Sequence, residues 1–165
     1  MRSRFAVALA GLTTLAACAR PAPVATAPNL VTVHAKDYAF EAPTSIPAGM
    51  TTFHFINDGP GLHHLSVVRL DSAKSFADLE LALKNPGPPP AWIVAVGGPN
   101  APDPMHDATA TMDLVAGNNA FVCFVDLPGN VPHFAKGMMS PLTVTPSTAT
   151  AAAPASDISI GLNDY

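Results

Sequence analysis

The stretch "FVCFVDLPGNVPHFAKGMMSPLTV", residues 121–144, reads as strand, loop and strand. Its first five residues are apolar, and its final residues alternate in the period of two that is typical of a half-buried strand. Between these ends lies a loop rich in turn-forming residues, which also carries a histidine and two methionines. The stretch therefore predicts two strands of a β-domain joined by a loop that presents Cys123, His133 and Met138.

The rest of the chain repeats this alternation of short strands and turns. Apolar residues make up 48% of the 165 positions, charged residues only 12%, and there are 18 prolines and 11 glycines. This composition favours short strands and many turns over long helices. Strand patterns occur at 30–40, 45–58 and 61–70, and two more at 108–126 are joined by a Gly-Asn-Asn turn at 117–119.

One segment has a helical rather than a strand period. Apolar residues at Phe76, Leu79 and Leu83, with Ser75 as a cap, predict a short amphipathic helix over 75–84. This helix belongs to a Pro/Gly-rich insertion, 71–108, which we expect to cover one side or end of the fold. The prediction is an all-β, antiparallel Greek-key β-sandwich with one short helix and this insertion.

The N-terminus reads as an export signal. Two arginines precede a short apolar run and the ending "LAAC", which resembles the lipobox of bacterial lipoproteins. By that resemblance, residues 1–17 are a lipoprotein signal peptide and Cys18 is lipidated. The apolar run is too short to cross a bilayer, so we expect contact with a membrane only through the lipid anchor. We expect an exported lipoprotein on the periplasmic face of a membrane or at the cell surface.

The mature chain is acidic. Loss of residues 1–17 removes two arginines, so the formal charge falls from −4 to −6. An acidic chain without a basic cluster predicts no nucleic-acid binding.

Low-complexity segments flank the predicted sandwich. Residues 18–28 are a Pro/Ala-rich tether and 147–157 a linker, which leaves 29–146 as the folded domain. Residues 158–165, "ISIGLNDY", are similar to 31–38, "VTVHAKDY". This match predicts that 158–165 begins a second, truncated repeat of the same domain.

Lipidation of one cysteine leaves Cys123 as a single thiol, which cannot form an internal disulfide. A lone cysteine is usually a small buried apolar residue, but here two histidines and a methionine are available to it. One thiolate, two imidazoles and a thioether are the ligands of a blue-copper site. Strand alternation turns His63 toward the more apolar face and His64 to the other, so His63 is the first choice and His64 the alternative.

Two segments carry a resemblance to a known family. "PHFAKGMMSPLTV" and "INDGPGLHHLSVV" are similar to the ligand segments of cupredoxins of the plastocyanin/azurin type. The resemblance covers about residues 29–146 and implies one type 1 copper ion. Nine residues separate the cysteine from the second histidine, more than in most small blue-copper proteins, and a histidine stands where the family usually has Asn after the first ligand. The metal ligands that it implies are His63, Cys123, His133 and Met138, with Met138 favoured over Met139.

The resemblance implies a non-enzymatic, one-electron carrier. Its redox protein partner is expected to dock on an apolar patch near the second histidine, formed by Leu127, Val131, Phe134 and Pro141. Three other functions stay open: copper storage or delivery, a metal-free binding module, and the non-catalytic half of a two-domain copper enzyme. In such enzymes a histidine beside the cysteine leads to a catalytic copper, whereas here the neighbours are Val122 and Phe124.

Overall fold

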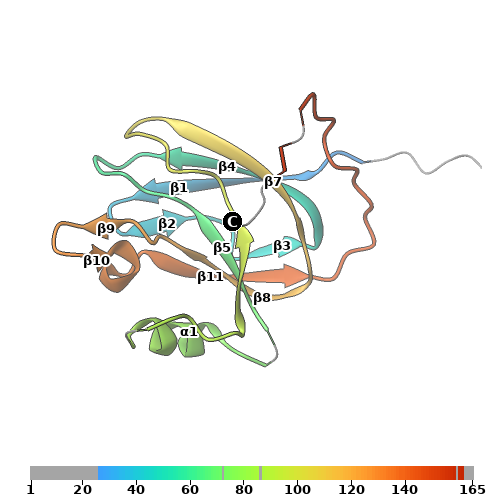
Figure 1. Cartoon of the computed structure of the whole chain (residues 1–165). Coiled ribbons are helices and arrows are strands. Elements are labelled where there is room, and N and C mark those ends of the chain that lie inside the picture. The colour runs from blue at the N-terminus through green and yellow to red at the C-terminus, as the bar shows by residue number, and fades with distance from the viewer. Residues whose placement is uncertain (1–25, 72, 86, 159, 162–165) are drawn as a thin grey trace, which may run out of the picture.

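Two stacked β-sheets form the body of the fold (Figure 1). The computed structural model describes residues 26–71, 73–85, 87–158 and 160–161. The first sheet has the order β2-β1-β4-β7, with β1 at Asn29–Lys36, β2 at Ala39–Glu41, β4 at Gly49–Asn57 and β7 at Asp107–Leu114. The second has the order β3-β11-β8-β5-β6, with β3 at Ser45–Pro47, β5 at Ser66–Leu70, β6 at Ile93–Gly97, β8 at Gly117–Val122 and β11 at Met139–Thr145. The predicted all-β sandwich is confirmed.

Strand pairing is mixed rather than wholly antiparallel, which corrects the sequence-based expectation. Strand β1 runs parallel to β4, and β3 runs parallel to β11. The reason is topological: after β2 the chain crosses to the second sheet at β3 and then returns to the first as β4, in the direction of β1. These crossings tie both sheets together near their edges.

Alternating side chains from both sheets form the main core. Val31 and Val33 on β1 and Phe53 and Phe55 on β4 are buried, and they face Phe121 on β8. The rings of Phe53 and Phe121 meet edge to face with centroids 5.7 Å apart. Burial of each large side chain contributes roughly 1.5–3 kcal/mol, so this layer supplies the stiffness on which a site at the end of the sandwich depends.

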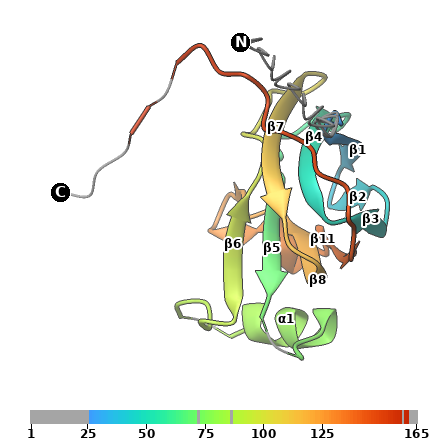
Figure 2. The ribbon, with the colours of Figure 1, turned by 90° about the vertical axis from the view of Figure 1, so that its right-hand side faces the viewer.

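A second core lies outside the second sheet, where α1 (Phe76–Leu83) packs (Figures 1 and 2). Ser75 caps the helix in a capping box with Asp78, as the sequence predicts, and Leu79 is fully buried. Because the helix covers this face, β5 buries both Val67, toward the first sheet, and Val68, toward α1. The insertion thus covers one side of the sandwich, as expected, and its strand β6 adds an edge to the second sheet.

The connection between β7 and β8 differs from the sequence prediction. The expected Gly-Asn-Asn turn at 117–119 lies inside β8, and the chain turns at Val115 and Ala116 instead. The two strands belong to different sheets, so no tight hairpin turn joins them. The two asparagines are accommodated in the strand because the side chain of Asn118 bonds the carbonyl of Lys74 and that of Asn119 bonds the carbonyl of Gly117.

The chain segments outside the sandwich are partly described. Thr26 and Ala151 form an isolated parallel bridge, and the Thr26 hydroxyl donates to the Thr150 carbonyl at 3.1 Å. The signal segment and Cys18 lie outside the described residues, as does part of the predicted repeat at 158–165. The described residues of that segment, 158, 160 and 161, do not form a strand. Among the described residues, no helix is both long enough and apolar enough to cross a membrane.

Candidate metal centre

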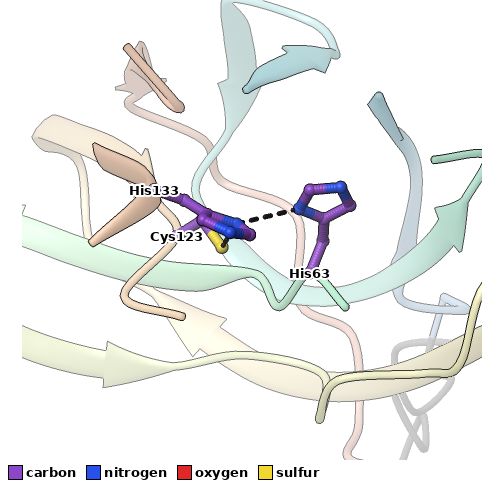
Figure 3. Close-up of side chains that lie close together, drawn as sticks. All are labelled: His63, Cys123 and His133. Atoms are coloured by element: carbon purple, nitrogen blue, oxygen red, sulfur yellow. Dashed lines mark hydrogen bonds between the residues drawn. The ribbon is translucent and has the colours of Figure 1, made fainter. Parts of the chain in front are cut away.

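Three of the four predicted ligands converge at one end of the sandwich (Figure 3). The nitrogen and sulfur ligand atoms of His63, Cys123 and His133 all lie within 4.8 Å of one another, and all three side chains are buried. The Nδ1 atoms of the two histidines are 3.1 Å apart, and the Sγ of Cys123 is 3.5 Å from Nδ1 of His133. These three ligand atoms are close enough together to hold one metal ion.

The long span between the cysteine and the second histidine is taken up by a small hairpin. Strand β9 (Asp126–Leu127) pairs with β10 (Val131–Pro132), so most of the nine intervening residues project out and return. The base of the hairpin is closed by backbone bonds: His133 donates to the Val125 carbonyl at 2.8 Å and Phe134 to the Cys123 carbonyl at 3.0 Å. Loop length therefore does not keep His133 from the cysteine.

The last part of the loop sets the position of Met138. A 3-10 helix, η1 (His133–Lys136), ends at Gly137, whose left-handed backbone (φ 99°) suits glycine. Met138 then donates its N–H to the His133 carbonyl and accepts from the N–H of Cys123, both at 3.1 Å. Its side chain is fully buried in the core between the sheets, in the same cluster as Cys123, whereas Met139 packs in the cluster beneath α1.

The first histidine comes from an irregular segment rather than from a strand. The sequence predicts a strand over 61–70, but β5 begins only at Ser66. Asn57 holds this segment: its side-chain amide donates to the carbonyls of Gly61 (2.9 Å) and Pro102 (3.1 Å) and accepts from the N–H of Gly59 (3.1 Å). The predicted orientation still holds, because His63 is buried on the inner side.

His64, the alternative first ligand, lies outside the cluster. Its ring lies beside Phe124, with centroids 6.0 Å apart, and burial lowers the pKa of the imidazole. Its backbone contributes instead: the backbone groups of His64 and Val125 lower the pKa of the Cys123 thiol. Sequence reasoning missed these two groups because backbone direction in an irregular loop leaves no residue pattern.

Burial controls the charge state of the site. Desolvation raises the pKa of the Cys123 thiol, against the two backbone groups, which lower it. Desolvation and the neighbouring His63 lower the pKa of His133, against Asp37 and Asp126, which raise it. At neutral pH the metal-free site therefore holds a protonated thiol and a neutral His133.

The second histidine is almost inaccessible to solvent. His133 is only 4% exposed. Tyr38 covers it, with the two rings edge to face at 5.2 Å. A hollow of about 240 Å³ lies over the two imidazoles, lined also by Asp37, Leu62 and Asp126.

Solved structures provide the comparison, since no family model and no curated protein matches the chain. Reduced auracyanin from the photosynthetic bacterium Roseiflexus castenholzii superposes with a TM-score of 0.50 at 21% identity, covering 73% of this chain and 100% of that one. This chain has the cupredoxin fold. Auracyanin A from Chloroflexus aurantiacus, a "blue" copper protein, also matches, at 21% identity and a TM-score of 0.47, with 72% of this chain and 99% of that one covered.

The donor set of this cupredoxin domain fits a type 1 copper centre. A thiol sulfur and two imidazole Nδ1 atoms form a buried three-atom group, and a thioether residue is linked to two of them through the backbone. Soft sulfur and borderline imidazole ligands together suit both copper oxidation states. The fit rests on the geometry of these side chains.

Proposed function

We propose that this protein is a type 1 copper electron carrier that is not itself an enzyme. The observation that carries the proposal is the convergence of His63, Cys123 and His133 within 4.8 Å on a β-sandwich. His63 and His133 would bind through Nδ1 and Cys123 through Sγ, with the thioether of Met138 as a weaker fourth ligand. Bound there, copper would supply the one-electron exchange between Cu(II) and Cu(I).

The chain itself supplies ligands that are buried and attached to paired core strands. Cys123 follows β8 directly, and β11 begins just after Met138, so both sit at ends of core strands that pair with each other. The backbone bonds across the ligand loop fix the distance between Cys123 and His133. A ligand set that changes little between the two oxidation states lowers the reorganisation energy of each electron transfer.

We propose that a redox protein docks over the hollow beside His133. Of the predicted apolar patch, Leu127 lines this hollow and Val131 is exposed nearby on the hairpin, whereas Phe134 lines a groove against α1. Pro141 lies on β11 and does not line the hollow. Carboxylates on the rim favour a partner that presents positive charge around an apolar contact.

The proposed location is outside the cytoplasm, with a lipid on Cys18. Support comes from the N-terminal sequence alone, "MRSRFAVALAGLTTLAAC". Fractionation of the full chain and of its Cys18→Ser variant tests it. The wild type should be found with membranes and the variant should be soluble, and equal partitioning of the two would contradict the anchor.

Copper titration of the full-length Cys18→Ser chain tests the proposed function, because only one thiol then remains. One equivalent of Cu(II) should produce an intense visible thiolate-to-copper band. Cys123→Ser should abolish the band. Met138→Leu should shift its energy, whereas the matched control Met139→Leu should leave it unchanged. No band in the parent chain would refute the proposal, and tight Cu(I) binding without a band would favour copper delivery.

A further inference from the structure

The far nitrogen of His63 has no hydrogen bond among the described residues. Its Nε2 is buried, in a side chain that is 1% exposed. One polar side chain lies near: the Oδ1 of Asp37 is 3.4 Å away, the distance of an ion pair rather than of an aligned hydrogen bond. A buried N–H without an acceptor is energetically costly, and the Asp37 carboxylate is the acceptor that lies near this nitrogen.

The backbone of Gly59 packs against the same nitrogen. A Cβ at this position would stand 2.8 Å from Nε2 of His63 and 3.2 Å from Oδ1 of Asp37. Only glycine fits against this junction without displacing one of the two groups. The imidazole is therefore confined, and the half-exposed carboxylate is the group that can adjust.

The turn between β1 and β2 presents this carboxylate. Tyr38 has a φ of 61°, a left-handed value that is unfavourable for an aromatic residue. The turn is closed by an ion pair of 2.7 Å between Lys36 and Glu41. In this conformation Asp37 lies beside His63 while the Tyr38 ring contacts His133, so a two-residue turn touches both imidazoles.

The positions of the imidazole protons also favour an acceptor at Nε2 of His63. A histidine that binds metal through Nδ1 must carry its proton on Nε2. The two Nδ1 atoms are 3.1 Å apart, so in the metal-free protein one of them donates to the other. If the proton of His63 is on Nε2, then His133 donates from its Nδ1 to the free lone pair of His63.

We propose that Asp37 is a positioning residue that accepts the Nε2–H of His63. It fixes the tautomer that leaves Nδ1 free for metal, and it places a negative charge behind the ligand. The tautomer part concerns the metal-free protein, and the charge part rests on the proposed copper function.

Two-bond ¹H–¹⁵N correlation spectra of the metal-free Cys18→Ser chain test the tautomer. His63 should carry its proton on Nε2 in the parent chain, and Asp37→Ala should shift it toward Nδ1–H or a mixture. Asp37→Glu should restore the Nε2–H form. The control is Asp126→Ala, which removes a carboxylate near His133 and should leave His63 unchanged. An Nδ1–H form in the parent, or an unchanged His63 in Asp37→Ala, would overturn the proposal.

The reduction potential of the copper-loaded protein tests the charge. Asp37→Ala should raise the potential, because a nearby carboxylate favours Cu(II), and the rise should exceed that in Asp126→Ala. An equal or smaller shift would overturn this part. Failure to load copper would count against the proposed function, and the spectra of the metal-free protein would still decide the tautomer.

Discussion

Substitution of Gly59 by alanine should weaken metal binding strongly. The added methyl group would lie 2.8 Å from Nε2 of His63, whereas ordinary contacts begin near 3.4 Å. The imidazole must therefore shift by roughly 0.6 Å, although its other nitrogen, Nδ1, already lies 3.1 Å from Nδ1 of His133. Overpacking of this kind costs about 1–3 kcal/mol.

The cost should fall mainly on the metal-bound form, because a metal bound at Nδ1 would prevent even a small shift of the His63 ring. A loss of about 1–3 kcal/mol corresponds to metal affinity weakened by roughly 5- to 150-fold. Competition titration with Co(II), which is redox-inert here, measures this affinity. The matched control is Gly61→Ala in the same segment, where an added Cβ meets no described atom within 4 Å. Unchanged affinity in Gly59→Ala, or an equal loss in Gly61→Ala, would refute this reasoning.

Three further predictions follow from the same contacts. Burial raises the pKa of the Cys123 thiol, so metal binding must release the thiol proton. The affinity for Co(II) should therefore rise roughly tenfold per pH unit between pH 7 and 8. An affinity that does not change with pH would show that the thiolate is already formed. Because the pKa of His133 is lowered, the metal-free protein should lose stability to urea as pH falls below the ordinary histidine value of about 6.5, and constant stability from pH 7 to 5 would contradict this. Asn57→Ala should lower the free energy of unfolding by about 2–4 kcal/mol, because three backbone groups lose their hydrogen-bond partner. Urea titrations measure this loss. A loss of less than about 1 kcal/mol would show that water replaces the side-chain amide.

The sequence predicts the ligand side chains better than the path between them. Cysteine, histidine and methionine are rare enough to be singled out, and His63 rather than His64 is buried as predicted, although its segment is irregular and not the expected strand. The hairpin of β9 and β10 could not be foreseen, because two-residue strands have no period to detect. It is this hairpin that brings His133 back to Cys123.

Fold prediction failed where tertiary pairing overrides local signals. The Gly-Asn-Asn sequence at 117–119 is a strong turn signal, yet it lies in β8 because its side chains find backbone partners there. Parallel pairing of β1 with β4 depends on the chain crossing between sheets, which no local pattern encodes. The Tyr38 ring covers His133 because the Tyr38 backbone is left-handed, a conformation that cannot be predicted for a tyrosine from its residue type.

The most direct measurement of the central claim is a spectroelectrochemical titration of the copper-loaded Cys18→Ser chain. The visible thiolate band should bleach on reduction with a one-electron Nernst slope and return fully on oxidation, through repeated cycles, with one copper retained per chain. Such cycling requires that His63, Cys123 and His133 hold both oxidation states. Loss of copper on reduction, or a band that does not return, would contradict an electron carrier.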